Sequence, residues 1–120
     1  MLEPIEGLPD GVIGVRAVGR VTADDYTTVL APAIEHATQG GQKVRLLLDL
    51  GDGFEGYDAS GMLADAGLGM EHLHSFEKVA VVTDADWIRR GIQMFGSLIP
   101  GEVRDYPSTD GAAAREWIAG

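Results

Sequence analysis

The sequence has no cysteine, and this absence excludes disulfide bonds, thiolate metal ligands and a cysteine nucleophile. It also has no apolar run near the roughly 20 residues that a membrane-spanning helix needs, and no charged-then-apolar secretion signal at its start. Basic residues are scarce, with 9 Lys and Arg against 19 Asp and Glu. Since nucleic-acid affinity depends on neutralising phosphates, we expect no nucleic-acid partner. The lack of a spanning run predicts no integral membrane association, and the lack of cysteine suits a cytoplasmic protein.

What is present fits one folded domain. The 120 residues lie in the common size range for a single domain, and we treat residues 1–120 as one unit. Hydrophobic residues make up 45% of the chain and charged residues 23%, which are ordinary values for a globular protein. The net charge of −10 is interpreted as a means of staying soluble.

The N-terminal part predicts a hairpin, a helix and a strand. Hydrophobic and other residues alternate over residues 12–21, which predicts a strand with one wet face, and residues 2–7 precede it as a hairpin partner. Thr22 to Asp25 resembles a capping box, and the helix behind it ends near Gly40. Pro32 predicts a kink in that helix. Residues 44–50 are nearly all apolar, which indicates a strand that is covered on both faces.

The remaining part alternates strands and helices. The expected elements are a glycine-rich loop at 51–56, a helix at 58–74, a strand at 78–83, a helix at 87–99 capped by Asp86 or its neighbour, a strand at 102–106 and a final helix capped by Asp110. The order is therefore β-β-α-β-α-β-α-β-α. It predicts an α/β fold with a mainly parallel five-stranded sheet, an antiparallel N-terminal edge and four helices.

This order, with Asp58-Ala-Ser-Gly-Met62 opening the second helix, resembles the STAS domain of anti-sigma-factor antagonists. The small stand-alone SpoIIAA-like proteins, grouped by fold with Sec14-type lipid-binding domains, are more similar still. Gly56-Tyr57, the segment 76–84 and Trp87 also resemble that group's pattern. The resemblance runs from Val12 to Ile118 and implies the SpoIIAA-like fold.

Ser60 is the first candidate site. The resemblance implies a phosphoacceptor here, because antagonist proteins carry a phosphorylated serine at the matching place. The start of a helix also suits a phosphate, since free N–H groups and the positive end of the dipole lie there. Ala59 and Met62 depart from the family motif, and Glu55 and Asp58 oppose a dianion. The favoured alternative is that Asp58 or Ser60 only caps the helix.

Two further patterns carry no predicted ligand. Residues 51–56 form a G-x-G-x-x-G between a strand and a helix, yet their two acidic side chains oppose a pyrophosphate, so we interpret them as a flexible turn. The carboxylates from Asp49 to Asp58 miss the calcium-loop spacing, and His72 and His74 are too close in sequence to share a helix face. We expect no cofactor, no metal and no catalytic residue.

The helix at 87–99 carries two apolar stripes, which is more than a helix on a sheet needs. Surplus apolar surface indicates a partner or a ligand groove. Three interpretations stay open: the final helix, with Trp117, covers the surplus; the chain forms a homodimer; or a groove holds a hydrophobic small molecule. The candidate surface, shared with the preceding helix, consists of Met62, Met70, Trp87, Gly91, Ile92, Met94, Phe95 and Leu98.

Our first functional hypothesis is a non-enzymatic binding module that dimerises or holds an apolar ligand through these two helices. The alternative is a partner-switching protein that is regulated by phosphorylation of Ser60 and acts on a protein partner. An enzyme is the least favoured class, because no activated nucleophile can be identified.

Overall fold

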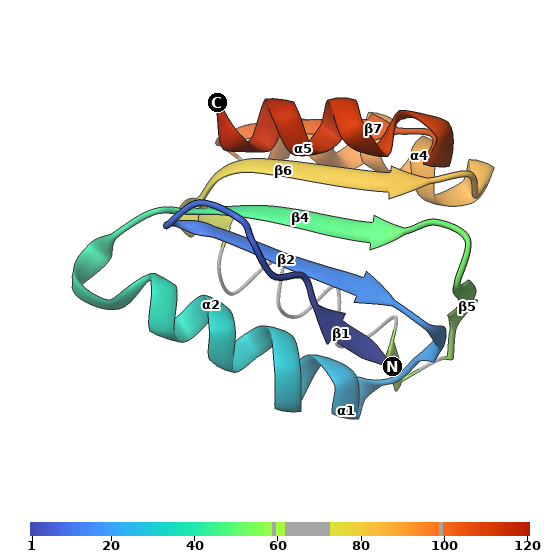
Figure 1. The fold of residues 1–120 in the computed structure, drawn as a ribbon, viewed down its shortest axis with the longest axis horizontal. Helices are drawn as coiled ribbons and strands as arrows, with labels where there is room; N and C mark the ends of the chain where they lie inside the picture. Colours follow the sequence, from blue (N-terminus) through green and yellow to red (C-terminus); the bar gives the residue numbers. More distant parts are fainter. Residues whose placement is uncertain (59, 62–72, 99) are drawn as a thin grey trace.

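The computed structural model describes residues 1–58, 60, 61, 73–98 and 100–120. Its main sheet has five strands in the order β1-β2-β4-β6-β7 (Figure 1). These strands are β1 (Leu2–Pro4), β2 (Val12–Ala17), β4 (Val44–Leu50), β6 (Phe76–Thr83) and β7 (Glu102–Tyr106). Neighbours from β2 to β7 are parallel, and β1 is antiparallel to β2. The predicted α/β fold with an antiparallel N-terminal edge is confirmed.

The expected single strand over residues 12–21 is wrong in one respect, because it is broken after Ala17. A separate strand β3 (Gly19–Val21) leaves the main sheet and pairs in parallel with β5 (Phe54–Tyr57), which overlaps the glycine-rich loop predicted at 51–56. Gly19 has a φ of +69°, and its N–H donates to the carbonyl of Gly53 at 2.7 Å. A positive φ is readily available to glycine, so the chain changes direction here without steric strain.

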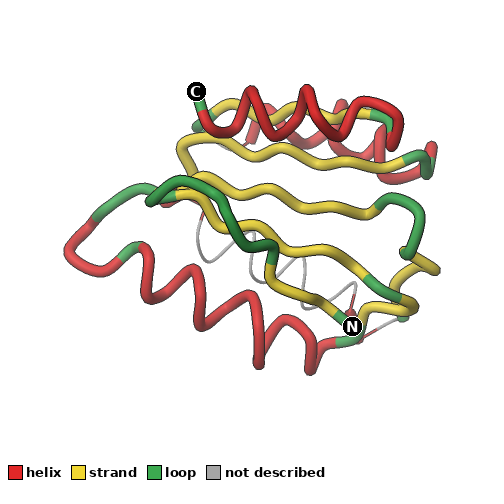
Figure 2. The backbone as a smooth tube through the Cα atoms, in the orientation of Figure 1, coloured by secondary structure: helices red, strands yellow, loops and turns green. Residues whose placement is uncertain are grey.

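The first helical path is assembled from three segments, α1 (Ala23–Asp25), the π-helical η1 (Tyr26–Leu30) and α2 (Ala31–Ala37), which form one course in Figure 2. The capping box is present, since the Thr22 N–H donates to Asp25 Oδ2 at 2.8 Å. The irregularity expected at Pro32 takes the form of a π turn, because the Ala31 N–H donates to Tyr26 O five residues earlier. Proline has no N–H to continue the α-helical ladder, and the wider turn directly precedes it.

The other helices differ from expectation mainly at their starts. They are η2 (Gln39–Gly41), η3 (Leu73–Ser75), α4 (Asp86–Phe95), η4 (Gly96–Leu98), η5 (Ser108–Asp110) and α5 (Gly111–Ala119). The cap position of α4 is not Asp86 but its neighbour Ala85, which makes no side-chain capping hydrogen bond; the Ala85 N–H donates to Thr83 Oγ1. Asp110 does precede α5, but its side chain makes no capping hydrogen bond. Most of the helix predicted at 58–74 lies outside the described residues.

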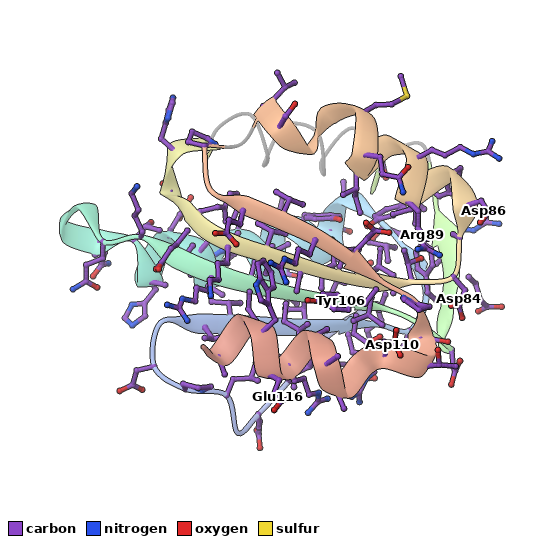
Figure 3. All side chains as sticks on the ribbon, turned by 90° about the horizontal axis from the view of Figure 1, so that it is seen from above. Asp84, Asp86, Arg89, Tyr106, Asp110 and Glu116 are labelled. Carbon is purple, nitrogen blue, oxygen red and sulfur yellow. The ribbon has the colours of Figure 1, made fainter. Side chains whose placement is uncertain are left out.

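Two apolar clusters hold the helices on opposite faces of the sheet. Leu46 and Leu48 on β4 belong to the first cluster, which includes buried side chains of the first helical path and is packed by side chains of α4. Leu47, between them, belongs to the second cluster with Ala114 and Ile118 of α5. Figure 3 shows α4 and α5 on opposite sides of the strands. The prediction that β4 is covered on both faces is confirmed.

Within the described parts of the chain, we find no helix with the length and apolar character needed to cross a membrane.

We expect Leu47→Ala to lower the free energy of unfolding by about 2–5 kcal/mol, because a buried leucine leaves a cavity in a packed core. Leu98→Ala is the matched control, since Leu98 is exposed and its truncation should cost less than about 0.5 kcal/mol. Urea unfolding of dilute protein, followed by circular dichroism, measures both values. Equal losses for the two variants would contradict this assignment of core and surface.

Candidate binding surface

The orientation of α4 is fixed by one apolar side and one ion pair. Ile88 and Ile92 pack against the first core cluster, as does Val103 on β7. Arg89 Nε donates to Asp105 Oδ2 at 2.8 Å, which ties the helix to the edge strand (Arg89 is labelled in Figure 3). Together these contacts prevent α4 from rotating about its own axis, so the residues on its other side are held toward solvent.

The side of α4 that faces away from the core carries large exposed apolar side chains. Trp87 is 53% exposed, Met94 69% and Leu98, in the adjoining η4, 62%. With Gly91 between them, they recur at helical spacing along one face, and we call these four residues the α4 apolar row. Of the two stripes that the sequence predicts, the one with Ile88 and Ile92 therefore faces the core and this one does not.

Of the three interpretations left open, the one in which the final helix covers this row is wrong. Because α5 packs in the second cluster, it lies on the opposite face of the sheet from α4. Its Trp117 ring has Lys78 Nζ at 5.1 Å and the Arg104 guanidinium at 4.7 Å from its centroid, and the Tyr106 ring at 6.4 Å. Trp117 is thus occupied by the cationic side chains of β6 and β7, which is favourable because the ring face attracts cations.

Trp87 at one end of the row joins a chain of aromatic rings. Its ring lies 6.2 Å from that of Tyr57 in an edge-to-face arrangement, and Tyr57 lies 5.3 Å from Phe54 in the same manner. Tyr57 is also stacked at 6.3 Å on Tyr26, which is buried. Tyr57 and Trp87 are two positions that carried the family resemblance, and the fold brings them together through β5. Sequence spacing did not reveal β5, because it overlaps the glycine-rich segment 51–56, whose composition is typical of a turn.

Ser60 lies where Asp58 caps the beginning of a helix. Its exposed hydroxyl donates to Asp58 Oδ1 at 2.7 Å and accepts from the Ala23 N–H at 3.3 Å. The Gly61 N–H also donates to Asp58 Oδ1, at 2.7 Å. A Cβ on Gly61 would lie 2.2 Å from the carbonyl oxygen of Val21, so only glycine fits there. The capping interpretation is therefore correct for Asp58.

The hydrogen bonds at this cap stabilise the charged form of Asp58. The Gly61 N–H and then the Ser60 hydroxyl lower the pKa of Asp58 below its ordinary value, with a smaller contribution from the charge of Arg20. Asp58 therefore carries its negative charge directly beside the Ser60 hydroxyl at neutral pH.

Two other carboxylates of the predicted set, Asp49 and Asp52, line one pocket. Asp49 accepts the Gly51 N–H at 3.0 Å through Oδ1 and faces Arg16 Nε at 3.4 Å through Oδ2. Both Asp49 and Arg16 line a pocket of about 260 Å³, on the side of the sheet where α5 begins. Among the described residues, no group of three or more acidic or histidine side chains is placed to hold a metal ion. His72 lies outside the described part of the chain.

Not all of the predicted surface can be placed. Met62 and Met70 lie outside the described residues, as does the side chain of Phe95. Trp87, Gly91, Ile92, Met94 and Leu98 are described, and of these only Ile92 packs into the core.

The fold is that of a small α/β domain with a mainly parallel sheet, and the chain belongs to the SpoIIAA-like family, whose match covers residues 12–119. Among solved structures it is similar to an uncharacterized protein with a SpoIIAA-like fold from Shewanella loihica PV-4, with 22% identity and a TM-score of 0.76, covering 98% of this chain and 92% of that one. It is also similar to the anti-sigma factor antagonist SpoIIAA in its unphosphorylated form, with 14% identity and a TM-score of 0.60, covering 94% and 96%. Identities this low establish the fold alone. No curated protein matches the chain.

We expect the acid sensitivity of the protein to depend partly on Asp58. Its lowered pKa means that its stabilising effect is complete above the pKa of the unfolded carboxyl and is lost as the pH falls through the folded value. Asp58→Asn keeps a capping oxygen but does not titrate. Unfolding free energies measured from pH 6 down to about pH 3 should therefore fall less steeply for Asp58→Asn than for the wild type. Parallel curves would contradict this role.

Proposed function

We propose that the protein is a non-enzymatic binding module, and that the α4 apolar row is the surface through which it binds an apolar partner. The observation that carries the proposal is the exposure of Trp87, Met94 and Leu98 on a helix whose other side is already packed. Exposed apolar residues that gather on one face of a soluble domain are typical of interaction sites. Tryptophan in particular contributes strongly to binding when it is buried in an interface.

The rigid placement of the row also supports binding. Ile88, Ile92 and the Arg89–Asp105 ion pair hold α4 in place, and the Tyr57 ring supports one edge of Trp87. A surface that is already ordered loses little conformational entropy when a partner docks. The row is therefore suited to recognition without rearrangement of the sheet.

We expect the fluorescence of Trp87 to report binding. The chain has two tryptophans, so Trp117→Phe leaves Trp87 as the only one. Its emission should move to shorter wavelength as the partner excludes water, either when the protein is concentrated or when oleate is added as an apolar probe. Met94→Asp should abolish the shift.

The control for this experiment is Trp87→Phe, which keeps Trp117 on the opposite face of the sheet and should show no shift. An emission from Trp87 that changes neither with protein concentration nor with oleate would refute the proposed binding surface.

A second candidate function is phosphorylation-dependent partner switching through Ser60, and one specific observation favours it. The Ser60 hydroxyl is exposed, and the Ala23 N–H already donates to it. A phosphate on Ser60 would gain that donor and the nearby charge of Arg20, and it would be repelled by Asp58. The charge repulsion between the phosphate and Asp58, which loss of the hydroxyl alone does not produce, would therefore displace Asp58 and disturb the segment next to Tyr57, which contacts Trp87.

We expect Ser60→Asp, which places a second carboxylate beside Asp58, to shift the concentration or oleate dependence of the Trp87 emission. Ser60→Ala removes the hydroxyl without adding charge and should leave that dependence close to the wild type. The amide NMR signals of Ala23 and Gly61 show whether the local hydrogen bonds have changed. If those signals move while the binding curve does not, Ser60 is not coupled to the apolar row.

A further inference from the structure

Gly91 forms an open notch in the middle of the α4 apolar row. Among the described residues, no atom lies within 4 Å of the position that a Cβ would occupy there, apart from its two chain neighbours and the helix's own nearby backbone. Trp87 stands four residues before the notch and Met94 three residues after it, and both side chains project into solvent. The row therefore presents an apolar projection and a matching recess side by side.

The four residues of the α4 apolar row are placed symmetrically about one point on the helix. The midpoint between Gly91 and Met94 falls between Ile92 and Gln93, and so does the midpoint between Trp87 and Leu98. A two-fold axis through that point brings an antiparallel copy of the helix into register with the first. It sets Met94 of each copy over Gly91 of the other, and Trp87 of each copy against Leu98 of the other. A self-complementary patch of this kind is what an isologous dimer requires.

The charges along this face permit two copies to meet. Each chain carries a net charge of −10, so copies repel one another over most approaches. On the exposed side of α4 the described polar residues are Asp86, Arg90, Gln93 and Ser97, which contain one acidic and one basic group. Two copies that approach each other along this helix therefore bring no excess of carboxylates into contact.

We propose, building on the binding role given above, that the partner of the α4 apolar row is a second copy of this chain. The two α4 helices pack antiparallel about an axis between Ile92 and Gln93, with Met94 of each copy seated in the Gly91 notch of the other. Three exposed side chains bury only part of the roughly 800 Å² per partner of a standard interface, so the dimer is weak and concentration-dependent. Added salt strengthens it, because screening reduces the repulsion between the two acidic chains.

The test uses two variants that should each associate weakly alone and should associate with each other when they are mixed. Gly91→Lys fills the notch with a charged chain, and Met94→Glu places a charge on the projection. Met94 is exposed, and Gly91 is partly exposed with no described atom in the way of a Cβ, so the fold should survive. In a mixed dimer, the introduced lysine of one chain faces the introduced glutamate of the other, while the second notch keeps its native Met94–Gly91 contact. Sedimentation equilibrium of each variant and of the 1:1 mixture measures association.

We expect each variant alone to raise the dissociation constant at least about tenfold, because one interface anchor is lost. The dissociation constant of the 1:1 mixture should lie within about threefold of the wild-type value. Ala113→Lys and Ala113→Glu make the same charges at an exposed position on α5, on the other side of the sheet, and should leave association nearly unchanged. Circular dichroism confirms folding of all four variants.

Two results would overturn the dimer. A wild-type chain that stays monomeric at high concentration and high salt has no such interface. A wild-type dimer whose two variants are not rescued by mixing does not use the antiparallel Gly91–Met94 register. If the chain is monomeric while Trp87 still responds to oleate, the second copy is excluded and the binding role proposed above stands; if Trp87 responds to neither, both fail.

Discussion

The burial of β4 on both of its faces is the constraint on which the rest of the structure depends. Leu46 and Leu48 require a cover on one side and Leu47 requires one on the other. Hydrophobic burial is the dominant favourable term in folding, so helices must occupy both faces. α5 is used on the second face, which leaves it unable to shield α4. The exposed row on α4 is thus a consequence of how the central strand is covered.

The same packing joins the two candidate sites. β3 leaves the main sheet at Gly19 and pairs with β5, and this places Tyr57 between the buried Tyr26 ring and Trp87 on α4. The next residue, Asp58, accepts hydrogen bonds from Ser60 and Gly61. One short strand therefore connects the helix cap around Ser60 with the end of the apolar row, which gives a physical route between the proposed phosphorylation site and the proposed binding surface.

Most of the regular elements could be predicted because their patterns are local. Alternation, the apolar run at 44–50 and the capping box at Thr22 each act within a few residues. The break after Ala17 could not be predicted, since β2 and β3 are both extended and only pairing with β5 separates them. The start of α4 could be predicted only to within one residue. The cap position is Ala85, beside Asp86, and the hydrogen bond from its N–H to Thr83 Oγ1 does not follow from capping propensity.

The sequence by itself determined the α/β order, the acidic surface and the surplus of apolar residues on the α4 helix, because these follow from composition and period. Only the tertiary structure decided which apolar stripe of that helix is core. The choice depends on Ile88 and Ile92 meeting the sheet and on Arg89 reaching Asp105, contacts between segments distant in the chain. The tertiary structure also decided that Trp117 packs on the opposite face of the sheet from α4, because the path of the chain after β7 determines on which side the last helix lies.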